Sequence, residues 1–378
     1  MVAQIRVAEA LTHLRSSPMV RAMAKPPITA NQVTFLRLIL LPIGGALFYF
    51  GLTAQWINLV FMTLLGCTDF VDGWLARKYG STELGRLMDP IADKVFVVVI
   101  FMPFIDLGWM QPWQVLLLLS REFVITALRS TYERLKISPK TAFLAKVKAW
   151  AQMAGCGVLF MMRVVPEKAM FYVLLAGTVL PVAATLVRYL VTGYLWRVSF
   201  IMAGWFGVLL ALHSFLGSEG NFQFLTLTIL GITWLSAWTY LVPAVRLIFT
   251  GKFGMPDWVR LLGAIALPIL LVDAQARPDL LPWVIMLIMC LEMAVGGLDN
   301  LLCVHSAQSS TLLWGLRVGL VALLTGLSLR LPHGHEYGMP LLYVALLVSL
   351  WGTAVTFYRG RNFYLEEPKE RTSALADD

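Results

Sequence analysis

Residues 67–94 read CTDFVDGWLARKYGSTELGRLMDPIADK, and they place four aspartates at the ends of two long apolar runs. Asp69 and Asp72 are three residues apart, and Asp89 and Asp93 are four apart. On α-helices both spacings put the members of a pair on one face. Carboxylates at the ends of apolar helices are costly to bury, so they usually mark a functional site. If the two helices lie antiparallel, the four acids converge.

The composition of the whole chain agrees with apolar helices on both sides of this stretch. Hydrophobic residues make up 58% of the 378 residues and charged residues 14%, with a mean hydropathy of +0.74. A typical soluble domain carries about 25% charged residues, so a soluble enzyme, a disordered regulator and a fibrous protein are excluded. At ~20 residues per helical span, we predict an all-α polytopic membrane protein with about twelve transmembrane helices. The formal charge of +8 then reports topology and not a nucleic-acid partner.

The predicted spans are apolar runs bounded by turn or charge signals. They cover residues 34–53, 55–76, 94–111, 113–135, 143–164, 168–190, 197–216, 222–247, 258–275, 281–303, 312–331 and 338–358. Most Lys and Arg residues outside the spans lie in the loops on one side, which the positive-inside rule makes cytoplasmic. An even number of spans places both termini on that side. The four aspartates lie at the same level, so we expect the site to face the cytoplasm.

Both ends of the chain differ from the apolar middle. The first 30 residues contain no apolar core long enough for a cleavable signal peptide. Residues 3–24 instead place apolar residues on one helical face and arginines around the other, which predicts an amphipathic helix on the membrane surface. A solvated leader is the alternative. We divide the chain into a juxtamembrane helix (1–30), a first membrane domain (31–197), a second membrane domain (198–360) and a polar tail (361–378).

Four converging carboxylates would repel one another unless cations hold them together. Their hard oxygen ligands suit Mg²⁺ or Mn²⁺. Small residues lie near the acids: Gly73, Ala76 and Gly85. Arg77 adds a planar cation that suits a phosphate group. Salt bridges to nearby basic residues would explain one or two of the acids, but not all four with the small residues between them.

The whole pattern is identified as the signature of the CDP-alcohol phosphotransferase family, matched without a gap or a substitution. Its eight residues are Asp69, Asp72, Gly73, Ala76, Arg77, Gly85, Asp89 and Asp93. The resemblance covers about residues 30–190, the six-span unit of that family. It implies that a substituted phosphate is transferred from a CDP-linked lipid to an alcohol, with release of CMP.

The resemblance also implies a role for each signature residue. Asp69, Asp72 and Asp89 would be ligands of two Mg²⁺ or Mn²⁺ ions, and Asp93 a further ligand or the base that takes the acceptor's proton. The remaining four would line the CDP site: Gly73, Ala76, Arg77 and Gly85. The ions would neutralise the pyrophosphate and polarise the phosphorus under attack. CDP-diacylglycerol is the implied donor.

A second polar cluster bears on the acceptor. Arg121 and Glu122 lie inside one predicted span, and Lys146, Lys148 and Gln152 open the next. Cations at this level suit an alcohol that carries its own phosphate, whereas positive-inside topology is the alternative for the two lysines. These segments are similar to those of bacterial phosphatidylglycerophosphate synthases, which implies sn-glycerol 3-phosphate as acceptor.

Two departures keep the acceptor open. Ala149 replaces the Thr of the Lys-x-Lys-Thr-x-x-Gln stretch, and Arg188 stands where family members that use inositol phosphate have an arginine. Inositol phosphate, inositol and a lipid alcohol therefore remain alternatives. The resemblance also implies a bacterial inner membrane and suggests a homodimer, which no residue tests.

The second half carries no comparable acid cluster. It is weakly similar to the first at an offset of 223 residues, which pairs Arg260 with Arg37 and Glu292 with Asp69. A degenerate repeat and a coincidence both explain this. We expect Glu292 and Asp299 to form ion pairs with Arg260 or Arg317. A twelve-span transporter is the alternative from another class, since two halves of six spans are common there.

Overall fold

The computed structural model describes residues 29–79, 83–137, 143–193, 197–305 and 311–364. The predicted surface helix over residues 3–24 and most of the polar tail lie outside this part. Every element within it is helical: α3 (Ala30–Leu47), α4 (Leu52–Tyr79), α5 (Glu83–Asp106), α6 (Pro112–Arg134), α7 (Phe143–Val164), α8 (Glu167–Thr192), α9 (Arg197–Phe249), α10 (Met255–Gln275), α11 (Pro282–Val304), α12 (Thr311–Arg330), the π-helical turn η1 (Gly334–Gly338) and α13 (Met339–Tyr364).

The helices confirm the all-α polytopic class. Among the described residues, eight are long and apolar enough to cross a membrane, at residues 30–47, 52–78, 167–192, 199–249, 255–275, 282–304, 311–330 and 334–363. The predicted count of twelve is not confirmed, since α5, α6 and α7 are not among the eight, and Gln152–Val164 of α7 counts only as a shorter apolar helix. The long α9 contains two of the predicted spans. Gly217, with φ 69° and ψ −174°, breaks the helical backbone between them.

Local signals explain where several helices begin and end. Thr29 caps α3, accepting a hydrogen bond from the Gln32 backbone while its own N–H donates to Gln32 Oε1 at 2.9 Å. This reciprocal pair is a capping box. Pro112 occupies the first turn of α6, where its missing N–H leaves no helical bond unmade. The α8 helix ends at Gly193, which adopts the left-handed conformation that favours glycine.

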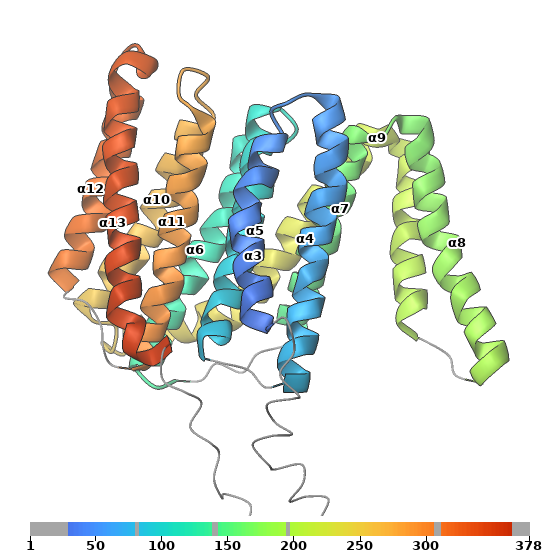
Figure 1. The fold of residues 1–378 in the computed structure, drawn as a ribbon, viewed down its shortest axis with the longest axis horizontal. Coiled ribbons are helices and arrows are strands. Elements are labelled where there is room, and N and C mark those ends of the chain that lie inside the picture. The colour runs from blue at the N-terminus through green and yellow to red at the C-terminus, as the bar shows by residue number, and fades with distance from the viewer. Residues whose placement is uncertain (1–28, 80–82, 138–142, 194–196, 306–310, 365–378) are drawn as a thin grey trace, which may run out of the picture.

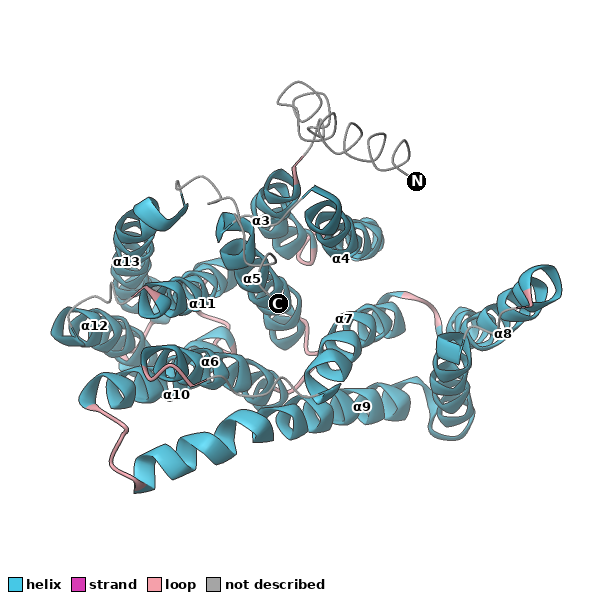
Figure 2. Cartoon of the chain, turned by 90° about the horizontal axis from the view of Figure 1, so that it is seen from below, coloured by secondary structure: helices cyan, strands magenta, loops and turns pink. Residues whose placement is uncertain are grey.

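The helices stand side by side, and α5 lies in the middle of the arrangement (Figures 1 and 2). It packs against α3 and α6 of the first half and against α11 of the second half. The α8 helix stands at one edge, and α9 runs from there past α7 to α6. Consequently α5 is buried along most of its length, and one hydrophobic core contains residues of both halves. The division at residue 197 stays a prediction.

Candidate active site

The four signature aspartates converge, as predicted from their spacing. The last turns of α4 carry Asp69 and Asp72, and the first turns of α5 carry Asp89 and Asp93. All four surround two residues of α3. Arg37 Nη1 lies 3.2 Å from Asp69 Oδ1 and 3.3 Å from Asp93 Oδ1, and its Nη2 lies 3.9 Å from Asp72 Oδ2.

A threonine one turn before the arginine contacts Asp72 as well and adds the fourth acid, Asp89. Thr34 Oγ1 lies 3.2 Å from Asp72 Oδ2 and 2.9 Å from Asp89 Oδ1. Because a hydroxyl has one proton, it donates to one of these carboxylates at a time. Thr34 and Arg37 are both buried, and their three-residue spacing puts them on one face of α3.

Sequence reasoning missed both residues as members of the site. The signal was present, because Arg37 is a charged side chain inside a predicted span, and such residues usually face protein or water and serve a function. Its partners come from two other helices, 32 to 56 positions along the chain. No local pattern around Arg37 reveals them.

The cluster is strongly unbalanced in charge. Among the described side chains, Arg37 forms ion pairs with Asp69, Asp72 and Asp93, and Asp89 is bonded to Thr34, so the acids outnumber the arginine that holds them. The Asp69 and Asp93 side chains are 38% and 52% exposed, whereas Asp72 is only 3% exposed. A group of hard oxygen ligands with excess negative charge and one open side fits divalent cations.

The acids do not form a ready metal cage as they stand. No group of three or more His, Cys, Asp or Glu side chains within the described ranges is arranged to hold an ion. The geometry gives the reason, since the Arg37 guanidinium lies between Asp69 and Asp93. Metal ligation by the four aspartates therefore stays a prediction, with Arg37 as the group that an ion would have to approach.

The other four signature residues lie at the same ends of α4 and α5. A Cβ atom on Gly73 would lie 3.5 Å from Arg77 Nη1, so the guanidinium runs back along α4 beside the glycine. Arg77 is exposed, Ala76 is half-buried and Gly85 is buried. An exposed cation next to an open stretch of helix backbone suits a phosphate group.

The residues predicted to bind the acceptor are not gathered at the aspartates. Arg121 is buried, and it donates hydrogen bonds to Glu122 Oε1 at 3.0 Å and to Ser236 Oγ of α9 at 2.9 Å. Gln152 Nε2 lies 3.5 Å from the same Glu122 oxygen. Arg121 thus takes part in a buried polar group between α6, α7 and α9, and its contact with an acceptor stays a prediction.

Three further cations were predicted to meet the acceptor phosphate. The side chains of Lys146 and Lys148 lie outside the described part of the structure, although α7 contains both positions. Arg188 is exposed on α8, which Figure 1 shows at the edge of the molecule, apart from α4 and α5. Their roles stay predictions.

An apolar cavity of about 390 Å³ lies along the part of α4 that precedes the acidic cluster, and none of the four aspartates lines it. It lies between α4, α5, α7 and α9, and Cys67 and Phe70 of α4 line it on either side of Asp69 in the sequence. Gly157 of α7 and Phe206 of α9 line it on the other side. An apolar space beside a charged site suits a substrate with a polar head and an acyl chain.

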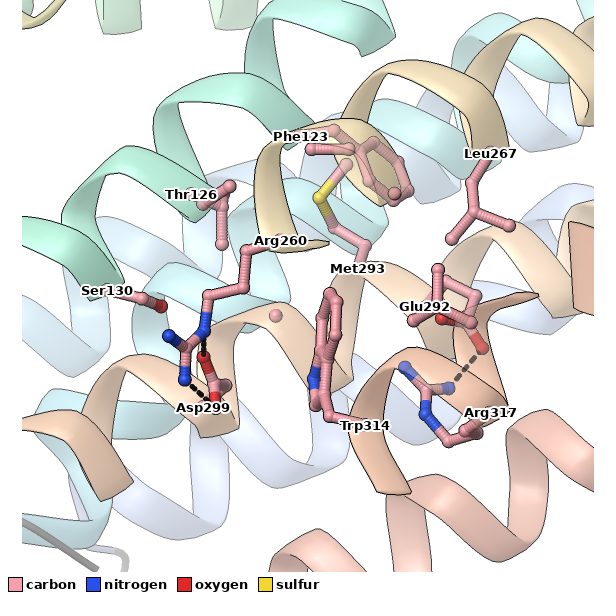
Figure 3. Close-up of a pocket in the computed structure, with 15 residues that line it drawn as sticks. Phe123, Thr126, Ser130, Arg260, Leu267, Glu292, Met293, Asp299, Trp314 and Arg317 are labelled. Carbon is pink, nitrogen blue, oxygen red and sulfur yellow. Dashed lines mark hydrogen bonds and ion pairs between the residues drawn. The ribbon is translucent and has the colours of Figure 1, made fainter. Parts of the chain in front are cut away.

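A small pocket with charged side chains lies between α6 of the first half and α10, α11 and α12 of the second (Figure 3). Arg260 Nε donates to Asp299 Oδ2 at 2.7 Å, and Arg317 Nη1 donates to Glu292 Oε1 at 2.5 Å. These contacts confirm the predicted ion pairs. The cavity measures about 40 Å³, enough for a few water molecules at roughly 10–15 Å³ each. We interpret these acids as structural.

Comparison with known proteins identifies the family. A family model described as CDP-alcohol phosphatidyltransferase matches residues 27–183. The CDP-diacylglycerol–glycerol-3-phosphate 3-phosphatidyltransferase of Rickettsia typhi is 33% identical over 133 residues, which are 35% of this chain and 75% of that protein. The chain belongs to the CDP-alcohol phosphatidyltransferase family. The identification made from the eight-residue signature is confirmed.

Other relatives of this family carry the same name. The protein from Cereibacter sphaeroides is 36% identical over 137 residues, covering 35% of this chain and 62% of the relative. That from Bacillus subtilis is 28% identical over 145 residues, covering 35% and 75%. No solved structure matches. The family model ends before the second half begins, and a transporter finds no support in these comparisons.

Proposed function

We propose that this family member transfers the phosphatidyl group of CDP-diacylglycerol to the hydroxyl of sn-glycerol 3-phosphate, giving phosphatidylglycerophosphate and CMP. The observation that carries the proposal is the convergence of the four signature carboxylates around Arg37. The names of the relatives support the donor and the acceptor. Membership of the family supports the reaction type.

We propose that two Mg²⁺ or Mn²⁺ ions bind at Asp69, Asp72, Asp89 and Asp93. The excess of negative charge and the exposure of two of these carboxylates support this assignment. When bound, such ions supply charge neutralisation at the pyrophosphate and polarise the phosphorus under attack. Arg37 and Thr34 hold the carboxylates close together before any ion binds.

Asp93 is the proposed base. Its side chain is about half exposed, which leaves room for an acceptor hydroxyl beside the carboxylate. In the proposed step Asp93 takes the hydroxyl proton while the acceptor oxygen attacks the lipid-linked phosphorus. The new P–O bond forms as the bond to CMP breaks. Arg77, exposed beside Gly73, would bind the CDP phosphates.

The apolar cavity beside Asp69 is proposed to take part of an acyl chain of the donor. Its lining by Cys67 and Phe70 places apolar side chains next to the acidic cluster on the same helix. A lipid whose head lies at the carboxylates would extend its chains along α4 and α7. The volume of about 390 Å³ accommodates only part of a diacylglycerol, so the remainder would lie in the bilayer.

The protein is an integral membrane protein, and its finer location is part of the proposal. The basic loops support a site on the cytoplasmic face, and the bacterial relatives support the bacterial inner membrane. A homodimer remains an expectation from the family alone. The acceptor rests on the names of the relatives, because Arg121 is engaged in a buried ion pair and Arg188 stands on α8.

A direct assay tests the function. The purified full-length protein is incubated with CDP-diacylglycerol, Mg²⁺ and labelled glycerol 3-phosphate, and both CMP and lipid-bound label are measured. We expect both products, and their loss when a chelator removes the metal. Inositol phosphate, inositol, serine and a lipid alcohol serve as alternative acceptors. Release of CMP with another acceptor but not with glycerol 3-phosphate would change the substrate, and no release with any of them would reject the function.

A further inference from the structure

Helix α11 of the second half packs against α5, which we call the catalytic helix because it carries Asp89 and Asp93. The contact lies between these two aspartates. A Cβ atom added to Gly297 of α11 would lie 2.6 Å from Cγ1 of Ile91 and 3.2 Å from its Cδ1. Both residues are buried. Ile91 stands midway between Asp89 and Asp93 on α5. The absence of a side chain at Gly297 therefore sets how closely α11 approaches the site.

The neighbouring glycine makes a second close contact, with α6. A Cβ on Gly296 would lie 3.0 Å from Cγ2 of Thr126. The hydroxyl of Thr126 accepts a hydrogen bond from Lys94 Nζ at 2.7 Å. Lys94 follows Asp93 directly in the sequence. Helix α11 therefore contacts α5 directly, through Gly297 and Ile91, and also indirectly, through Thr126 of α6.

A third contact extends the packing toward the other end of the helices. A Cβ on Gly45 of α3 would lie 2.8 Å from Cε of Met286 and 3.3 Å from Cγ1 of Val99, so Met286 of α11 reaches α3 beside α5. Residue numbers increase along α5 from Ile91 to Val99, whereas their neighbours on α11 decrease from Gly297 to Met286. Helix α11 therefore lies antiparallel to α5 and contacts it along about half its length.

Buried ion pairs fix α11 on its opposite side. Asp299 pairs with Arg260 of α10, and Glu292 pairs with Arg317 of α12 (Figure 3). In the sequence, these two acids lie on either side of Gly296 and Gly297. Ser349 of α13 also donates to Glu292 at 2.8 Å. Sliding or rotating α11 would separate buried charges, which is strongly unfavourable. The α11 helix is thus held in a defined register against α5.

We propose that the second half of the chain acts as a rigid support for the catalytic carboxylates, with Gly297 as a positioning residue that acts through Ile91. The inference rests on the proposed function, because it takes the aspartates of α5 to be the reacting site. It gives residues 198–378 a role that needs no ligand of their own. Groups held for phosphoryl transfer lose activity steeply when displaced by about 1 Å.

The test is a double-mutant cycle in the full-length protein. Gly297→Ala introduces the Cβ that lies too close to Ile91. Ile91→Ala removes both clashing atoms, since the remaining Cβ of residue 91 lies 3.9 Å from the added atom. Gly319→Ala on α12 is the matched control, because nothing lies within 4 Å of a Cβ at that position.

Two properties are measured on each variant. One is the pair kcat and KM for CMP release. The other is the Mn²⁺ concentration that half-maximally stabilises the protein against thermal unfolding without substrates. We expect Gly297→Ala to lower kcat by about ten- to a hundredfold, to leave KM for both substrates nearly unchanged and to raise the Mn²⁺ requirement. The double variant should recover most of both losses, and Gly319→Ala should behave as wild type.

The outcomes separate this inference from the proposed function. A folded Gly297→Ala protein with wild-type kcat and Mn²⁺ dependence overturns the inference, as does a double variant no better than Gly297→Ala. If Gly297→Ala does not fold, Ile91→Ala alone decides, since loosening the contact should raise the Mn²⁺ requirement and an unchanged value counts against the proposal. Lack of CMP release by the wild type rejects the function, while the Mn²⁺ measurement still tests the support.

Discussion

Two regions of the molecule combine buried arginines with carboxylates, and they differ in charge balance. In the first, Arg37 pairs with three of the four signature aspartates, and Thr34 bonds to the fourth. In the second, Arg317 pairs with Glu292 and Arg260 pairs with Asp299, while Asp257, itself paired with Arg134, lies 4.0 Å from Arg260. The first region has two carboxylates open to solvent and a large apolar cavity beside it, whereas the second encloses a space of about 40 Å³.

The weak similarity between the halves makes the contrast instructive. At the offset of 223 residues, Arg260 corresponds to Arg37 and Glu292 to Asp69. Arg260 nevertheless pairs with Asp299, at the position of Ala76. Acids that outnumber their cations leave charge for a ligand to neutralise, and acids that are matched one to one hold helices together.

The largest expected effect is on catalysis, at the aspartate cluster around Arg37. Asp93→Asn removes the proposed base and one carboxylate from the cluster, and we expect CMP release to fall by about 10²- to 10⁴-fold. The fold should persist, because the side chain is half exposed. Initial rates and circular dichroism of the purified variant check both statements. Activity near the wild-type rate would remove Asp93 from the chemistry.

The next prediction compares the two arginines directly. Arg260→Met leaves Asp299 buried without its partner, which costs about 3–5 kcal/mol of stability. Arg37→Met should also lower the unfolding temperature, but Mn²⁺ should restore it, because the ions can neutralise the exposed acids of that cluster. Thermal unfolding with and without Mn²⁺ measures the difference. Equal rescue of both variants would contradict the distinction between the regions.

A smaller effect is expected at the apolar cavity. Gly157→Leu on α7 places a side chain in this space, where nothing lies within 4 Å of an added Cβ. We expect a rise of about threefold or more in KM for long-chain CDP-diacylglycerol, with little change for a short-chain donor. Gly231→Leu, at an exposed site on α9, is the control. Equal effects on both donors would exclude acyl-chain binding there.

The smallest effect concerns a pair at the far end of α10 and α11, outside the spans. Hydrogen bonds from Arg277 lower the pKa of the Asp279 carboxyl from 3.8 to about 2. A depressed pKa stabilises the fold above the unfolded value, and this contribution is lost as pH falls from about 4 to about 2. The unfolding temperature should therefore decrease slightly more in wild type than in Asp279→Asn across that range. Parallel curves would show that the pair contributes nothing.

The structure also shows which parts of the fold and of the candidate site can be predicted from a single sequence. Helical class and the convergence of the four aspartates follow from apolar length and from three- and four-residue spacings, which are local properties. Arg37 and Arg121 were harder, because their partners depend on which helices become neighbours. Ser236, the partner of Arg121, lies 115 residues away. The contact between Gly297 and Ile91 has no sequence signal, since a glycine in an apolar helix has many explanations.

The central place of α5 has a consequence for how the protein is made. Ile91 and Gly297 are separated by 206 residues (297 − 91), and ribosomes add about 5–20 residues per second. A newly inserted α5 therefore waits about 10–40 seconds before α11 leaves the ribosome. During that interval four negative charges and an uncovered apolar face share one helix pair in the bilayer. Helix α11, which is synthesised late, thus completes the packing around aspartates that are synthesised early. The enzyme is expected to become active only after its C-terminal half has inserted.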